Sequence, residues 1–156
     1  MPLASFNASP AGEAIALMLL CCASRRFAGA MAAGRPYPSL AAAESATRTA
    51  FESLTWDDVL EAMSAHPRIG ARVQGQSAAE QSGVADVSRA ALAAGNARYE
   101  ERFGYVFLIC ATGLSGEQMR AALEARLGND PATERAVATM ELEKITLLRV
   151  AKALGS

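Results

Sequence analysis

Alanine is the feature that most constrains this chain, because it accounts for more than a fifth of the 156 residues. It has the highest intrinsic helix propensity, and the leucine, glutamate, arginine and methionine residues around it are also good helix formers. Valine, isoleucine, threonine and aromatic residues rarely cluster as β-strands require. The sequence therefore predicts an all-α fold, and its length fits one domain over residues 1–156, a single-domain helical bundle of about seven to nine helices.

Start and stop signals place the helices along the chain. Ser9 followed by Pro10 is typical of an N-cap and a first helical turn. A residue before proline is disfavoured in the α region, which predicts a helix end at His66, before Pro67. The apolar run 103–111 is ambiguous, and we expect a buried helix or an extended segment there. The other expected helices are one that ends near Gly34, a short one that opens at Ser77, and those over about 39–54, 55–66, 86–102, 115–127 and 131–154.

Charge and apolar runs argue against several classes of protein. The net charge of -1 lacks the positive field that attracts nucleic acid. The apolar run Ala14–Ala23 is about half of the ~20 residues that cross a bilayer, and no lysine or arginine precedes it, so we expect neither a membrane span nor a signal peptide. Three cysteines, two of them adjacent, favour a reducing cytoplasm over a disulfide framework. The cysteine, histidine and carboxylate residues lack the spacing of a metal site, and no cofactor-binding motif is found, so the sequence predicts neither a metal nor a cofactor.

His66 is the only histidine and the first candidate for chemistry. The terminal carbonyls of the preceding helix would favour its protonated form, which makes it a proton donor near neutral pH. The alternative is a polar residue that only completes a turn. Glu80 is the candidate partner carboxylate, although it occupies the position from which it would cap its own helix. Ser77 and Gln81 share that ambiguity.

Arg149 is the second charged candidate. At about 100° per residue it falls between Leu142 and Ile145 on the last expected helix, so it points inward, where a guanidinium needs an anion. Glu141 and Lys152 fall on a neighbouring bearing, which keeps open the alternative of a solvated helix edge.

Four ordered motifs run through most of the chain, and together they are far more specific than any short motif alone. They are His66-Pro67-Arg68-Ile69-Gly70, then Glu80-Gln81 with Gly83-Val84, then Asn96 with Tyr99-Glu100 and Phe103-Gly104-Tyr105-Val106-Phe107, and last Lys144-Ile145 with Leu148-Arg149. In this order the motifs resemble those of the 2-oxo-4-hydroxy-4-carboxy-5-ureidoimidazoline (OHCU) decarboxylase family of the ureide pathway.

The resemblance implies an all-helical homodimeric enzyme without metal or organic cofactor. Its implied reaction converts OHCU, a ureido-imidazoline derived from urate, into (S)-allantoin and carbon dioxide. By position, His66 matches the catalytic histidine, Glu80 the carboxylate beside it, and Arg149 the inward arginine. The substrate-contacting segments are matched by Pro67, Ser77, Gln81 and the backbone of Phe107, Leu108, Ile109, Cys110 and Ala111.

A second hypothesis keeps the scaffold but not the catalysis. It describes a helical module that binds a small molecule, and it is suggested by Arg25-Arg26-Phe27, where relatives of the resembled family commonly carry serine and tryptophan. This hypothesis predicts ligand binding without release of carbon dioxide.

Overall fold

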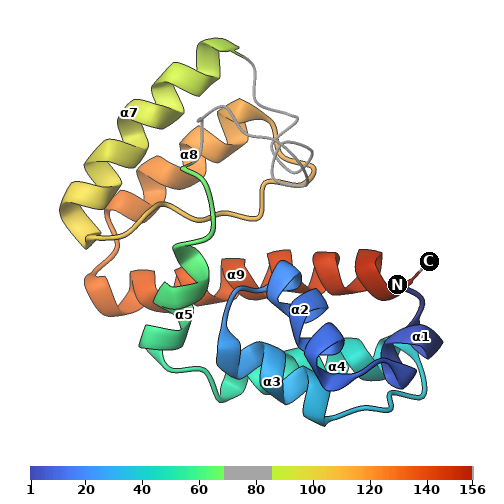
Figure 1. Cartoon of the computed structure of the whole chain (residues 1–156). Helices are drawn as coiled ribbons and strands as arrows, with labels where there is room; N and C mark the ends of the chain where they lie inside the picture. Colours follow the sequence, from blue (N-terminus) through green and yellow to red (C-terminus); the bar gives the residue numbers. More distant parts are fainter. Residues whose placement is uncertain (69–85, 156) are drawn as a thin grey trace. The chain divides into compact units, whose positions relative to one another are not determined.

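A computed structural model of the chain describes residues 1–68 and 86–155, with the side chains of residues 86–88 left aside. Within these ranges every regular element is an α-helix, which confirms the all-α prediction (Figure 1). Among the described helices, none combines the length and the apolar character that a membrane crossing needs. The helices are α1 (Leu3–Ala8), α2 (Ala11–Cys21), α3 (Arg25–Ala33), α4 (Leu40–Glu52), α5 (Trp56–Met63), α7 (Asp86–Phe103), α8 (Gly116–Leu127) and α9 (Pro131–Leu154).

The chain forms two compact units. The first unit comprises Met1–Ala65 and Leu142–Ser156, and the second comprises His66–Glu141. Helix α9 therefore contributes its first half to the second unit and its last half to the first. The single domain over residues 1–156 stays a prediction.

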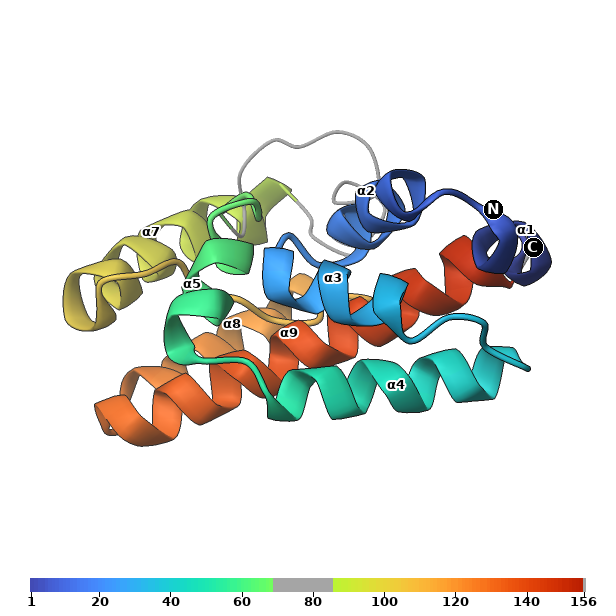
Figure 2. The same ribbon diagram turned by 60° about the horizontal axis from the view of Figure 1, so that its bottom comes forward.

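The first unit is built around α3, which packs against α2 and α4 (Figure 2). Phe27 of α3 is fully buried and its ring centroid lies 5.7 Å from that of Phe51 on α4. The two ends of the chain meet in this unit, because the amino group of Met1 donates to the Ala153 carbonyl at 2.9 Å. An exposed hydrogen bond thus ties the start of the chain to its last helix.

Ser9 does not cap the helix that follows it. It ends the additional short helix α1 instead, and its Oγ donates to the Phe6 carbonyl at 2.9 Å. Helix α2 begins at Ala11 with Pro10 at the N-cap and no side-chain cap. The predicted N-cap role is wrong because of a distant residue: Arg35 donates to the Phe6 and Ser9 carbonyls at 2.7 Å each and to the Ser9 hydroxyl at 3.2 Å.

Two capping boxes confirm the helix starts expected from local sequence. Thr55 and Asp58 form one at the start of α5, and Ser115 and Gln118 form the other at the start of α8. In each, the hydroxyl accepts from the third residue's N–H while that residue's side chain accepts from the capping residue's N–H, so two helix-end donors are satisfied. Helix α5 ends at Met63, three residues before the predicted end at His66.

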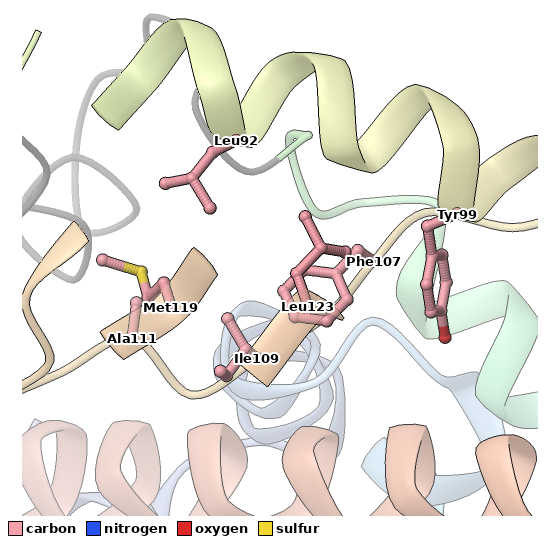
Figure 3. Close-up of a cluster of buried hydrophobic side chains, with 7 residues drawn as sticks. All are labelled: Leu92, Tyr99, Phe107, Ile109, Ala111, Met119 and Leu123. Carbon is pink, nitrogen blue, oxygen red and sulfur yellow. The ribbon is translucent and has the colours of Figure 1, made fainter. Parts of the chain in front are cut away.

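The second unit is formed by α7 and α8, which pack against each other and are joined by an extended connection after Phe103 (Figure 1). Gly95 allows this close approach, because an added Cβ there would lie 2.2 Å from Leu123 Cδ2. The connection confirms the extended alternative predicted for residues 103–111. Its side chains enter a buried cluster between the two helices, made of Leu92, Tyr99, Phe107, Ile109, Ala111, Met119 and Leu123 (Figure 3).

Candidate active site

His66 lies in the irregular stretch that follows α5 along the chain, and its side chain is half-buried. Pro67 is half-buried as well, and it prevents the chain from continuing as a helix. Half-burial leaves part of the imidazole surface exposed, and the role of proton donor stays a prediction.

Arg68 anchors the His66 stretch to α7. Its Nε and Nη2 donate to the two oxygens of the Glu100 carboxylate at 2.9 and 3.1 Å, a bidentate ion pair. The same carboxylate accepts from Asn96 Nδ2 at 2.6 Å, one helical turn earlier. Asn96 is 1% exposed, and its Oδ1 accepts from the backbone N–H of Phe107 at 2.9 Å. A hydrogen-bonded path therefore leads from the His66 stretch to the connection between α7 and α8.

Side chains of α8 and α9 hold the backbone of the predicted substrate-contacting segment Phe107–Ala111. The Leu108 carbonyl accepts from Arg126 Nη1 at 2.7 Å, and the Cys110 N–H donates to Glu141 Oε1 at 3.0 Å. The side chains of Phe107, Ile109 and Ala111 belong to the buried cluster of the second unit. These three side chains therefore face the cluster, whereas the peptide groups of the segment and the half-buried Cys110 side chain are less enclosed.

Two of these peptide groups are available. In residues 1–68 and 86–155, no hydrogen-bond acceptor is found for the N–H groups of Leu108 and Ile109. Buried backbone donors are nearly always paired with protein, water or ligand. Two adjacent donors without an acceptor among the described residues are consistent with the ligand contacts implied for this segment.

A buried charge network lies behind the segment. Glu134 is fully buried and accepts from Arg126 Nε and Nη2 at 2.9 and 2.6 Å, from Asn129 Nδ2 at 3.1 Å, and from the Tyr99 hydroxyl. The Arg126 guanidinium also lies 4.4 Å from the centroid of the Phe107 ring. Burial, and then the hydrogen bond to Glu134, raise the pKa of Tyr99, which keeps the phenol protonated as the donor. The network ties the connection to the end of α8 and the start of α9.

Arg149 lies in the first unit, on the last half of α9. Its side chain is half-buried, whereas Leu142 and Ile145 on the same helix are buried. Burial raises the pKa of the Cys21 and Cys22 thiols, and the positive charge of Arg149 lowers it in part.

Cys21 and Cys22 should react slowly with alkylating reagents. Desolvation by burial raises the pKa of each thiol from 9.0 to about 11, so the reactive thiolate at pH 8 is only about one part in a thousand. Cys110 is half-buried and more accessible. We expect iodoacetamide at pH 8 to label Cys110 of the native protein first, as followed by peptide mass spectrometry. Equal labelling of all three in the native state, and not only after unfolding in urea, would contradict this.

The structure places the predicted site residues as follows. His66, Pro67 and the segment Phe107–Ala111 belong to the second unit, and Arg149 belongs to the first. Ser77, Glu80 and Gln81 lie outside the described residues, and so does the short helix expected to open at Ser77. The convergence of His66, Glu80 and Arg149 on one cavity stays a prediction.

Sequence patterns assign no role to several residues around the segment. Asn96 stands in a motif without a role, a solvated helix edge is one of two alternatives for the stretch that holds Glu141, and no pattern distinguishes Arg126 or Glu134. The available signal was Asn96 itself, because asparagine is a poor residue for the interior of a helix unless its side chain has a partner.

Comparison with known proteins decides the family. The OHCU decarboxylase family model matches residues 7–151, a range that contains every predicted site residue. The chain belongs to the OHCU decarboxylase family. Of its relatives, the uric acid degradation bifunctional protein TTL of Arabidopsis thaliana is 39% identical in an alignment over 145 residues that covers 85% of this chain and 45% of the plant protein. The OHCU decarboxylase of Haloferax volcanii is 28% identical in an alignment over 129 residues that covers 78% of this chain and 77% of the relative.

A solved structure of the OHCU decarboxylase family is also similar. The crystal structure of an OHCU decarboxylase in the presence of (S)-allantoin matches with a TM-score of 0.76 and 34% sequence identity, over 88% of this chain and 96% of that one. This chain spans less than half the length of the bifunctional plant relative. The similarity therefore covers one OHCU decarboxylase chain almost completely, but only a part of the plant protein.

Proposed function

We propose that this chain is a carboxy-lyase that decarboxylates OHCU to (S)-allantoin in urate degradation, without a cofactor. The observation that carries the proposal is the match to nearly the whole of an OHCU decarboxylase chain whose structure was solved with (S)-allantoin. The second unit supports it, because hydrogen bonds link Arg68 of the His66 stretch through Glu100 and Asn96 to the N–H of Phe107, the residue before the backbone donors of Leu108 and Ile109.

The residues that suggest the alternative of an inactive binding module have structural partners in the first unit. Arg25 Nε and Arg26 Nε each lie 2.8 Å from a carboxylate of α5, those of Glu61 and Asp58. Phe27 is fully buried against Phe51. The three residues thus have structural partners in the first unit, and their departure from the family pattern needs no change of function to explain it.

The substrate itself supplies the electron sink of the proposed reaction. The bond between the ring carbon and the carboxylate breaks, and its electron pair forms a C=C bond to the neighbouring ring carbon. The pair of the ring C=N bond moves to nitrogen, which takes up a proton, and carbon dioxide leaves. The enol-like intermediate then gains a proton on the carbon that carries the ureido group, while its hydroxyl proton is released and a C=O bond forms. The protein needs only to hold the substrate and to move protons.

Each predicted site residue has one role in this mechanism. Arg149 binds a polar or anionic group of the substrate, and Glu80 with nearby amides holds the ureido side. His66 directs the proton to one face of the intermediate, which yields one enantiomer. Further contacts to the substrate come from Pro67, Ser77, Gln81 and the backbone of Phe107, Leu108, Ile109, Cys110 and Ala111.

Optical activity tests the proposal directly. OHCU is generated freshly, the protein is added, and circular dichroism of the product is followed together with carbon dioxide release. We expect rapid formation of (S)-allantoin with the protein and slow racemic decay in buffer alone. Decay in the presence of folded protein that equals the decay in buffer would reject the proposed reaction.

The assembly and compartment are part of the proposal as well. We expect a homodimer, as the family resemblance implies, which light scattering coupled to size-exclusion chromatography measures. The cytoplasm is the expected compartment, because Cys21, Cys22 and Cys110 are all free thiols, as is usual where glutathione keeps cysteines reduced.

A further inference from the structure

We propose that Glu100 and Asn96, one turn apart on α7, are positioning residues that hold the His66 stretch and the Phe107–Ala111 segment in a common register. The inference rests on the proposed function. The two side chains raise the turnover rate by positioning other groups, and they do not contact the substrate. Both residues lie in the second unit together with the two segments that they join.

The first link acts on the His66 stretch. Arg68 follows His66 by two residues, and its guanidinium binds both oxygens of Glu100. A bidentate pair fixes orientation as well as distance, because two parallel N–H···O bonds restrict rotation of the guanidinium. The Glu100 carboxylate is in turn held by Asn96 Nδ2 at 2.6 Å, so the anchor of Arg68 does not swing freely.

The second link acts on the backbone segment. Asn96 donates to Glu100 through Nδ2, and its Oδ1 accepts from the N–H of Phe107, at the start of the predicted substrate-contacting segment. With Asn96 1% exposed and Phe107 1% exposed, water cannot replace this bond without a rearrangement of the core. The side-chain amide of Asn96 therefore fixes the position of Phe107, directly before the backbone donors of Leu108 and Ile109.

The ion pair is poorly explained by stability alone. The Arg68 side chain is 65% exposed, and exposed ion pairs contribute little to the free energy of folding. Catalysis is more sensitive, because a displacement of about 1 Å at a reacting group can cost about a hundredfold in rate. Removal of the pair should therefore lower kcat strongly and leave Tm nearly unchanged.

A double-mutant cycle on the pair tests the first link. We expect Arg68→Gln and Glu100→Gln each to lower kcat for OHCU at least about tenfold, with KM changed less than about threefold. The double variant should lose no more than either single variant, because both remove the same link. Arg68→Lys keeps the charge but not the fork, so it should recover part of kcat.

The matched control is Glu101→Gln on the same helix. Glu101 is exposed and has no ion-pair or hydrogen-bond partner among the described side chains, so kcat should stay at the wild-type value. If both pair variants retain kcat within twofold of this control, or if their losses multiply in the double variant, the inference is overturned. A fall in Tm without a fall in kcat would also overturn it.

Asn96→Ala tests the second link through binding. We expect its dissociation constant for (S)-allantoin, measured by calorimetry at a temperature where the variant is folded, to rise at least about fivefold. An unchanged constant in the folded variant would overturn this link, and if the variant does not fold the cycle on Arg68 and Glu100 decides. The wild-type assay separates the two levels: an inactive wild type rejects the proposed function and this inference together, whereas an active one with unaffected variants rejects only the inference.

Discussion

His66→Ala is expected to lower OHCU turnover by about a hundredfold to ten-thousandfold, the range that general acid–base groups contribute. The chain has one histidine, so no second imidazole replaces it. The half-buried side chain lies in an irregular stretch outside the helices, and its truncation opens no cavity in the buried cluster of the second unit. Stopped assays of (S)-allantoin formation, with helical circular dichroism and Tm measured on the same samples, check this result.

Ser64→Ala is the matched control for the His66 variant. Ser64 is exposed in the same turn, and its Oγ donates to the Glu61 carbonyl at 2.6 Å. Its removal perturbs the local turn without removing the proton donor, so turnover should remain near that of the wild type. Near-normal turnover by folded His66→Ala would reject the role of His66 and leave the fold untouched.

Arg126→Met is expected to destabilise the protein by about 3–5 kcal/mol, because it leaves a buried carboxylate without its counter-charge. Arg126 is 7% exposed and supplies two of the donors to the fully buried Glu134, as well as the donor to the Leu108 carbonyl. For a chain of this length the loss corresponds to a fall in Tm of about 10 °C. Thermal unfolding followed by circular dichroism measures it.

Two further variants separate charge burial from the loss of side-chain packing. Arg126→Met combined with Glu134→Leu removes both charges, and it should be more stable than Arg126→Met alone. Arg120→Met removes an exposed arginine of the same helix that pairs with Glu117, and it should leave Tm nearly unchanged. Equal falls in Tm for Arg126→Met and Arg120→Met would show that the buried Arg126–Glu134 pair contributes no more to stability than an exposed pair.

Much of the candidate site was within reach of the sequence because its motifs are ordered along the chain. The set of motifs around His66, Asn96 and Arg149 pointed to the family, and the family model then matched residues 7–151. The sequence also favoured a peptide-lined segment at Phe107–Ala111, once the resemblance was considered. It did not indicate which side chains hold that segment, because hydrogen-bond partners from different helices leave no local pattern.

The alanine content determined the all-α class by itself, and the capping boxes at Thr55 and Ser115 determined two helix starts. Pro67 set only a limit for the preceding helix, which ends at Met63. These features act within one helical turn, so neighbouring residues suffice to specify them. Only the tertiary structure decided that Ser9 serves the preceding helix, that Asn96 receives the Phe107 N–H, and that Glu134 is buried with Arg126. In each case a polar group leaves water and must find its partner elsewhere in the fold, and the packing of the elements selects that partner.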